Sequence, residues 1–504
     1  SGLVGGNSGG RGTVTVSSGT VLPNANALPA GSSLSLAFEA QAPNAPTYPF
    51  YSPTPPGIVF ETESNQTPAD PFTLDASANP APLRPDRVAQ VVLSPDLVNQ
   101  NGFSHLDFNN SDGNITIPTG VSLTAAPGGA IKFTAANLDI EGSISAPGGS
   151  LSFTVTDFTP FTQVLGTLDQ SPSPDSARGN FLLGSTASLS TAGLVVNDLA
   201  GSPAPGSLPL ATVGGTITIK SYSADLLNGS SINVSGGLEI NPAGQQSYGS
   251  AGSIVIKAGQ DPAIPSLLGG HLLLESDLKG YAGTGTHVTG GNLKIQAPLI
   301  QIGGVAPNPD TLLLSPDFFN RGGFVNFAIT GLGAPTGTVF QYLPAISISP
   351  GTLINPVSQN WSAVPDPING GVLLNPSVLQ QGVRNPVSLA FGATGVRDSF
   401  SSSLIVRGDL VMGTGSVIRT DPQSVSGGGV SFSGDTVAIL GTVIAPGGTI
   451  SLTGAQDSGV LFANQTQALA TIDLAPGSLL STAGVTLLTP DSSGHNYRTG
   501  TVLN

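Results

Sequence analysis

Residues 128–155 decide the fold, and they read GGAIKFTAANLDIEGSISAPGGSLSFTV. Apolar and polar side chains alternate in short runs, which is the period of two expected for half-buried strands. Each run ends at Gly, Asn or Pro-Gly, residues that favour turns because they accept or preset the backbone angles of a turn. The stretch therefore predicts very short strands joined by tight corners, with an inward-facing set made of Ile131, Phe133, Leu138, Ile140, Ile144, Leu151, Phe153 and Val155.

The same pattern returns far along the chain, where residues 427–453 read GGGVSFSGDTVAILGTVIAPGGTISLT. An offset of 299 aligns Phe432 with Phe133 and Ile439 with Ile140. Shorter versions occur at 214–237, 251–259 and 290–304. The corners of these repeats are predicted at Pro127, Gly128, Pro147, Gly148, Pro446 and Gly447.

A repeat of about 20 to 25 residues that carries two or three short strands is typical of one coil of a parallel β-helix. A single coil cannot bury its apolar face, whereas a stack of coils can. The predicted fold class is therefore all-β, a parallel β-helix (β-solenoid) with long loop insertions. The alternative is a sandwich of antiparallel hairpins, which favours longer strands and two-residue turns.

A second motif, which we call the Leu-Ser-Pro-Asp echo, occurs in two distant segments. LSPDLVN at 93–99 and LSPDFFN at 314–320 are each followed by Gly-Phe. Ser or Asp can cap a helix and Pro suits its first position, so each copy predicts a helical turn that leads into a strand.

Changes in composition divide the chain. We expect a glycine-rich segment at 1–30, either a linker or a strand exchanged between molecules, and a proline-rich insertion at 31–90. The solenoid is predicted over 91–480, with insertions at about 156–210 and 331–400, followed by a C-terminal segment at 481–504.

Composition and charge exclude several classes of partner. The 504 residues include 68 Gly, 42 Pro and no Cys, and the net charge is −15. Nucleic acids and anionic lipids require clustered Lys and Arg, so neither is an expected partner. No apolar run is long enough to span a membrane. The chain begins at Ser1, and we therefore expect a processed chain or a segment of a longer one.

The ordered succession of three motifs resembles the filamentous haemagglutinin family of large bacterial exoproteins, which belong to the two-partner-secretion type. In chain order, these motifs are KAGQDP at 257–262, GGNLKIQAPLIQIGG at 290–304 and LSPDFFNRGGF at 314–324. The resemblance implies a right-handed β-helix exported to the bacterial cell surface. The family's secretion domain carries Asn-Pro-Asn-Gly, whereas this chain has NQNG at 99–102, so the resemblance points to the shaft.

No catalytic, cofactor-binding or metal-binding residues are predicted. The four His residues lack metal-site spacing, and a weak calcium site in the loop of Asp169, Asp175 and Asn180 is the remaining alternative. Aromatic residues in proline-rich stretches are candidates for contact with a partner or a glycan, because their rings stack on apolar surfaces and sugars. They are Tyr48, Phe50, Tyr51 and Trp361.

The expected function is a non-enzymatic, extracellular or cell-surface structural protein of a bacterium, either the shaft of an adhesin or the subunit of a fibre. Its expected partners are other copies of itself, joined head-to-tail or by strand exchange, or a host or matrix surface. The alternative is a polysaccharide lyase or glycoside hydrolase on a β-helix scaffold. Asp139 and Glu141 would then be the paired carboxylates that glycoside hydrolysis uses.

Overall fold

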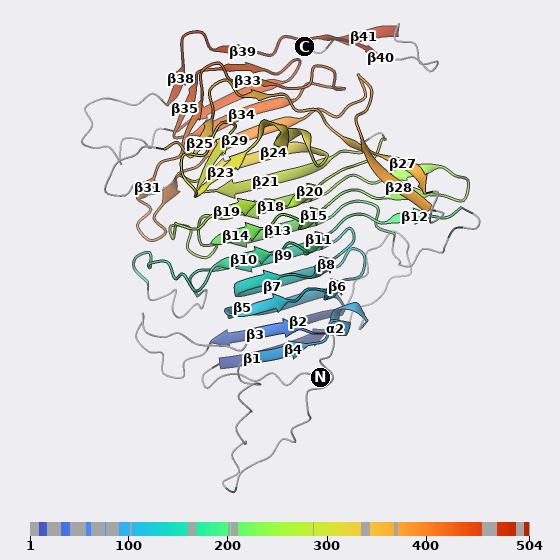
Figure 1. Ribbon diagram of the computed structural model, residues 1–504, viewed down its shortest axis with the longest axis vertical. Coiled ribbons are helices and arrows are strands. Elements are labelled where there is room, and N and C mark those ends of the chain that lie inside the picture. The colour runs from blue at the N-terminus through green and yellow to red at the C-terminus, as the bar shows by residue number, and fades with distance from the viewer. Residues whose placement is uncertain are drawn as a thin grey trace.

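A computed structural model describes residues 10–17, 32–40, 57–61, 76, 90–100, 103–159, 168–199, 202, 210–285, 287–333, 343–366, 371–455, 471–489 and 498–502. Nearly all of the regular structure in these residues is β-strand. Figure 1 shows the strands stacked along the long axis of the molecule. Most neighbouring strands are parallel, which excludes the antiparallel sandwich as the main architecture.

The longest series of parallel pairings runs through the whole stack, and we call it ladder A. Short strands with small or branched residues favour this arrangement because each strand buries one face and leaves the other in water. Its members, in order, are β2 (Ser32–Ala40), β5 (Phe103–Ile117), β7 (Ala130–Ile140), β9 (Ser150–Val155), β13 (Thr216–Ser221), β18 (Ser253–Lys257), β21 (Gly291–Ala297), β24 (Phe324–Gly331), β29 (Ser388–Ala393), β34 (Gly429–Gly434) and β37 (Thr449–Gly454).

A second series, ladder B, is divided into two parts. The first contains β4 (Gln90–Leu93), β3 (Gly57–Phe60), the C-terminal halves of β5 and β7, β10 (Asn180–Leu183), β14 (Ser223–Leu226) and β19 (Leu272–Leu274). The second contains β23 (Thr311–Leu314), β22 (Leu299–Ile302), β25 (Ile346–Ile348), β32 (Asp409–Met412), β35 (Thr436–Ile439) and β38 (Ile472–Leu474).

The third series, ladder C, is also in two parts. The first is β6 (Ser122–Thr124), β8 (Ser143–Ser145), β11 (Ser188–Ser190), β15 (Ser231–Asn233) and β20 (Asp277–Lys279). The second is β26 (Leu353–Ile354), β33 (Val417–Arg419), β36 (Thr442–Ile444) and β39 (Leu479–Ser481). The chain passes from one ladder to the next and returns, as when β7 is followed by β8 in ladder C and then by β9 beside β7.

The core is built from rows of apolar side chains that lie in register along the stack. One row of ladder A runs through Leu36, Phe108, Phe133, Phe153, Ile219, Ile256, Ile295, Ile329, Phe391, Phe432 and Leu452. All except Leu452 are buried, and neighbouring rings such as Phe108 and Phe133 lie 5.4 Å apart between centroids. The predicted inward-facing set of 131–155 is confirmed, because every member is buried.

The corners also form where the sequence predicts them. Gly128, Gly148 and Gly447 have φ values of 75°, 63° and 60°, a region that a side chain rarely adopts. The second glycine of one corner is required for a different reason. A Cβ atom on Gly149 would lie 1.9 Å from the carbonyl oxygen of Gly129 in the adjacent corner, so the layers can stack closely only without it.

Both copies of the Leu-Ser-Pro-Asp echo form a helical turn that precedes a strand of ladder A, as predicted. The turns are the short helix α2 (Asp96–Asn99) before β5 and the 3-10 helix η2 (Pro316–Asn320) before β24. Neither turn has a side-chain cap, although the Ser94 hydroxyl, before the N-cap residue Pro95, accepts the N–H of Asp96 at 3.3 Å. The turns pack beside strands of ladder C, α2 against β6 and η2 against β26.

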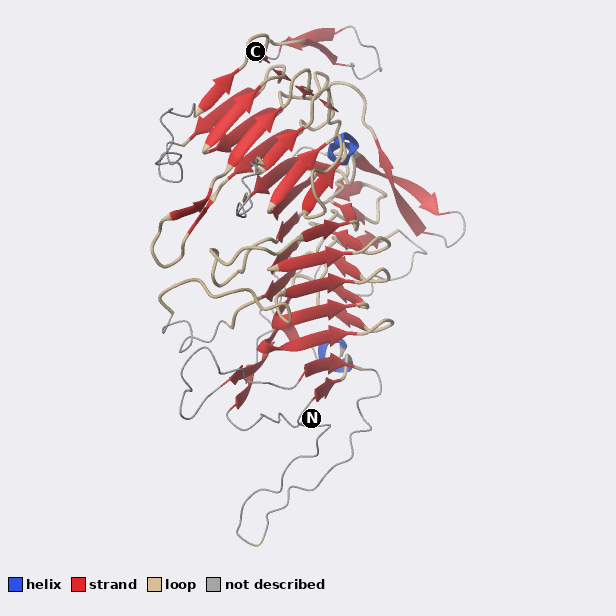
Figure 2. Cartoon of the chain, turned by 60° about the vertical axis from the view of Figure 1, so that its left-hand side comes forward, coloured by secondary structure: helices blue, strands red, loops and turns tan. Residues whose placement is uncertain are grey.

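The echo carries a shared topology. In the first copy, β4 pairs parallel with the preceding strand of ladder B, β3, and in the second copy β23 pairs parallel with β22. In both pairs the later strand lies closer to the start of the stack than the earlier one. β23 is therefore an additional strand. Ladder A steps directly from β18 to β21, whereas ladder B must place β23 between β19 and β22. Figure 2 shows the strands of the upper part tilted relative to those of the lower part.

The described strands extend beyond the boundaries expected from composition. β2 and β3 lie within the segment expected to be an insertion at 31–90, and β10 and β11 lie within 156–210. The segment 331–400 contains stacked strands and also a projecting hairpin, β27 (Asn360–Asp366) with β28 (Gly371–Ser377). Further antiparallel pairs are β1 (Gly10–Ser17) with β2, β16 (Leu238–Ile240) with β17 (Gln246–Tyr248), β30 (Val396–Arg397) with β31 (Leu404–Val406), and β40 (Thr486–Thr489) with β41 (Arg498–Val502).

Candidate functional site

The break in ladder B forms a cleft with a volume of about 440 Å³, which is within the range of ligand pockets. β19 and β23 lie next to each other here, but they are not hydrogen-bonded to each other. The cleft is lined by the segments 271–275 and 309–313 together with Asp225. We call it the ladder-break cleft.

Ionisable groups of one sign dominate this cleft. His271 Nε2 lies 2.9 Å from Asp225 Oδ1, and both side chains are partly exposed. Glu275 and Asp310 are exposed at the same cleft, and no Lys or Arg is among its lining residues. The rims are apolar, because Leu273 of β19 and Leu313 of β23 are 38% and 47% exposed. The cleft can therefore hold a cationic group beside an aliphatic stem.

Sequence reasoning missed this pair. His271 has no partner at a recognised spacing, and Asp225 precedes it by 46 residues, which is one step along ladder B. Aligning Ala224–Leu226 with Leu272–Leu274 would have placed Asp225 and His271 together, but such an alignment requires the strand register to be known. No group of three or more His, Cys, Asp or Glu able to hold a metal occurs within the described residues.

A second polar cluster joins three loops beside the stack. Asp261 is fully buried, and its carboxylate accepts four backbone N–H groups: Asp157 at 2.6 Å, Phe158 at 3.1 Å, Ala263 at 2.7 Å and Ile264 at 2.8 Å. The first two belong to the loop after β9 and the last two to the loop before β19. Asp261 therefore fastens loops that are about a hundred residues apart, and burial raises its pKa.

Asp157 lies in the same cluster and is 1% exposed. The pKa of Asp157 is raised to about 6, mainly by burial; the carboxylates of Asp261 and Asp175 contribute to this rise, and the Asp175 N–H and the Arg178 guanidinium oppose it. Arg178 Nε donates to the Asp157 carbonyl at 2.9 Å, and Arg178 Nη1 lies 3.2 Å from Asp112 Oδ1.

These pKa directions predict a stability that falls as the pH rises from about 4 to about 6. Below 3.8 the Asp157 carboxyl is protonated in both the folded and unfolded states. Between 3.8 and about 6 the folded state holds the extra proton, so raising the pH costs up to about 1.4 kcal/mol per unit. Asp157→Asn should make this slope shallower, although the contribution of the buried Asp261 remains, and urea denaturation of both proteins over that range measures the difference. Equal slopes would contradict the assignment.

The predicted contact residues have different outcomes. Tyr48, Phe50 and Tyr51 lie outside the described residues. Trp361 is half-buried in β27, and its ring lies 4.4 Å from that of Tyr281 between centroids. The backbone N–H of Trp361 donates to the Ala282 carbonyl at 2.7 Å. Trp361 therefore attaches the hairpin to the stack.

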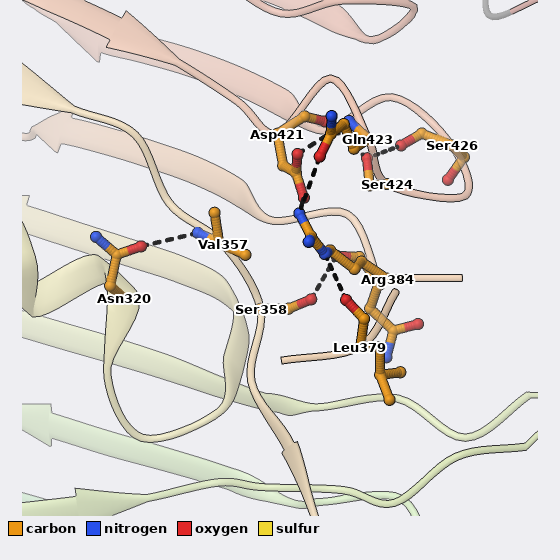
Figure 3. Close-up of polar contacts among 10 residues, drawn as sticks. Asn320, Val357, Ser358, Leu379, Arg384, Asp421, Gln423, Ser424 and Ser426 are labelled. Carbon is orange, nitrogen blue, oxygen red and sulfur yellow. Dashed lines mark hydrogen bonds and ion pairs between the residues drawn. The ribbon is translucent and has the colours of Figure 1, made fainter. Parts of the chain in front are cut away.

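The base of the hairpin is held by further polar contacts, which Figure 3 shows. Asn320 of η2 accepts the N–H of Val357 at 2.8 Å, before β27. After β28, Arg384 Nε donates to the Leu379 carbonyl at 2.7 Å, and Arg384 Nη1 reaches Asp421 Oδ2 at 3.4 Å and Gln423 Oε1 at 3.3 Å. The hairpin thus projects from a braced base (Figure 1).

The alternative enzymatic residues are placed on the outer surface of ladder B. Asp139 lies in register between Thr116 and Leu182, and burial raises its pKa. Glu141 follows β7, with its carboxylate over Gly184. In the loop proposed for calcium, the Asp175 N–H bonds to Asp157, and Asn180 bonds to Asn137 at 3.2 Å. These contacts do not converge on a common ligand position.

Comparison of the chain with protein-family models, with curated proteins and with solved structures finds no match in any of the three. In the described part of the chain, no helix has the length and apolarity needed to cross a bilayer.

Proposed function

We propose that this chain is a non-enzymatic structural protein of the bacterial cell surface, a right-handed parallel β-helix that serves as the shaft of an adhesin or as a fibre subunit. The proposal joins the resemblance to the filamentous haemagglutinins with the architecture of three ladders. It is independent of any catalytic group.

One observation carries the proposal: a single row of apolar residues extends from Leu36 to Leu452 through eleven parallel strands in register. Each buried Phe or Ile in such a row stabilises the fold by about 1.5–3 kcal/mol. Because each layer contacts only its neighbours, the architecture extends in one direction and suits a spacer or a fibre.

The last described layer supports self-association. In ladder B, Ile472 and Leu474 of β38 lie in register with Val437 and Ile439, which are 1% and 0% exposed. Ile472 and Leu474 are 40% and 49% exposed, and β38 has no strand partner on its far side within the described residues. A layer from a second copy would bury these side chains and pair this edge.

Ile472→Asp with Leu474→Asp is therefore expected to abolish filaments seen by negative-stain electron microscopy and to leave single rods. The residues are half-exposed, so the fold should survive. The matched control is Val195→Asp with Leu199→Asp, two exposed positions of 48% and 40% in the middle of the chain. Globular particles without a rod shape would refute the shaft, whereas rods that never associate would refute only the self-assembly.

A polysaccharide-cleaving enzyme is the second candidate, favoured by the raised pKa of Asp139, since a general acid must hold its proton near neutral pH. Release of reducing or unsaturated sugars from acidic polysaccharides would support the enzyme. The structural proposal instead expects binding to cells or matrix without release of sugars.

A further inference from the structure

The lysines of the chain are concentrated on one face of the stack. Four of the five Lys residues lie on the outer face of ladder A, each directly after a buried apolar residue. One of them, Lys132, is paired with Asp107 at 3.0 Å. The other three are exposed and form no ion pair with the described residues. We call Lys220, Lys257 and Lys294 the lysine cluster.

The lysine cluster occupies three consecutive strands of ladder A, β13, β18 and β21 (Figure 1). Lys220 and Lys257 are in direct register, so their Cα atoms are about 4.8 Å apart. Lys294 is in register with Val255, one strand further along and two residues earlier. The seven strands of ladder A from β13 to β37 contain no Asp or Glu. The positive charge is therefore uncompensated on this face, although the chain as a whole carries −15.

A groove with a volume of about 270 Å³ begins at the lysine cluster. It starts at Lys294 and crosses β21, β24, β29, β34 and β37 on the outer face of ladder A. The positions in register with Lys294 on the next two strands are Ala328 and Ala390, whose small side chains leave this space open. Most of the other outward-facing lining residues carry hydroxyl or amide groups: Asn292, Asn326, Ser388, Ser431, Thr449 and Ser451.

These two features restrict the ligand. The unpaired ammonium groups attract anions, and like charges on neighbouring strands repel each other, so a bound anion would relieve that repulsion. Hydroxyl and amide groups can both donate and accept hydrogen bonds, as the hydroxyls of a sugar do. A DNA duplex carries one charge per about 1.7 Å of its axis and would meet only three cations on a protein of negative net charge. A more sparsely charged sugar polymer fits better.

We infer that the outer face of ladder A from β13 to β37 binds a linear acidic polysaccharide. Its carboxylate or sulfate groups lie at the lysine cluster, and its neutral hydroxyls bond to the side chains of the groove. The inference deepens the structural role proposed above, on which it rests, because it names the chemical class of the matrix partner.

The test measures binding of the whole chain to immobilised polygalacturonate, dextran sulfate and neutral dextran by biolayer interferometry. Binding to polygalacturonate identifies carboxylates as the ligand and binding to dextran sulfate identifies sulfates, whereas neutral dextran should not bind. Added NaCl should weaken the binding, because the lysines are exposed. Lys220→Gln, Lys257→Gln and Lys294→Gln combined should weaken it about tenfold, since three exposed charge pairs are lost.

The matched control combines Lys279→Gln, Arg321→Gln and Arg419→Gln, which removes the same charge outside the outer face of ladder A. A second variant, Ala328→Glu, keeps all three lysines and places a carboxylate beside Lys294. It should also weaken binding, whereas Ser188→Glu, on ladder C, should not.

Equal weakening by the control triple, no binding to either acidic polysaccharide, or equal binding of neutral dextran would overturn the inference. Equal binding of polyglutamate would also overturn it, because any polyanion, including the carboxylates of a second copy, would then suffice. Negative-stain electron microscopy separates this inference from the shaft. Rods that bind neither acidic polymer would overturn the inference alone, whereas particles without a rod shape would refute the shaft and the inference together.

Discussion

Ile140→Asp is expected to lower the free energy of unfolding by more than about 4 kcal/mol. Ile140 is fully buried and lies in register between Ile117 of β5 and Leu183 of β10. A carboxylate at this position would lose its water and gain no donor, because both neighbours are aliphatic. Urea denaturation followed by circular dichroism measures the change.

The control for this substitution is Ser152→Asp, which introduces the same charge on the outer face of ladder A, in register with Lys132. Its expected effect is within about 0.5 kcal/mol. If Ile140→Asp does not fold, Ile140→Val provides the measurement, with an expected loss of about 0.5–1.5 kcal/mol. Unchanged unfolding of both Ile140 variants would show that the side chain does not face the core.

Arg178→Met is expected to lower the free energy of unfolding by about 3–5 kcal/mol. Arg178 is paired with Asp112, whose side chain is 1% exposed, and Arg178 also donates to the Ser111 carbonyl at 2.9 Å. The ion pair is the one polar contact of the Asp112 carboxylate among the described residues. Without Arg178, this buried charge would have no compensation.

The exposed pair of Lys132 and Asp107 is a matched comparison, because its 3.0 Å contact is similar and its side chains are 51% and 40% exposed. Lys132→Met should cost less than about 1 kcal/mol. Arg178→Met combined with Asp112→Asn should recover more than half of the loss, since the uncompensated charge is removed. Equal effects of Arg178→Met and Lys132→Met in urea denaturation would rule out burial as the cause.

Much of the strand pattern could be predicted locally. Alternation within 128–155 identifies the buried face, because successive side chains of a strand point to opposite sides. The corners follow from Gly and Pro, and Gly128 and Gly148 have the positive φ values that only glycine adopts easily. The helical turns at Asp96 and Pro316 follow from a repeated motif for the same local reason.

The candidate sites could not be predicted in this way. The Asp225–His271 contact, the Arg178–Asp112 pair and the fastening of Asp157 by Asp261 join residues 46, 66 and 104 positions apart. These separations depend on loop lengths and on the number of strands in each layer, and no short-range pattern encodes them. Trp361 was a candidate for contact with a partner or a glycan, and its packing against Tyr281 depends on how the hairpin folds back.

The sequence by itself determined that short strands with an alternating face pack into a layered β structure, because the period of two and the glycine corners act within a few residues. Only the tertiary structure decided where the layers fail to match. β23 repeats the topology of β4, but it meets β19 because earlier layers already occupy that side of the stack. An unpaired strand edge within the stack depends on how the strands of different layers are positioned relative to one another. No single segment of the sequence specifies these relative positions.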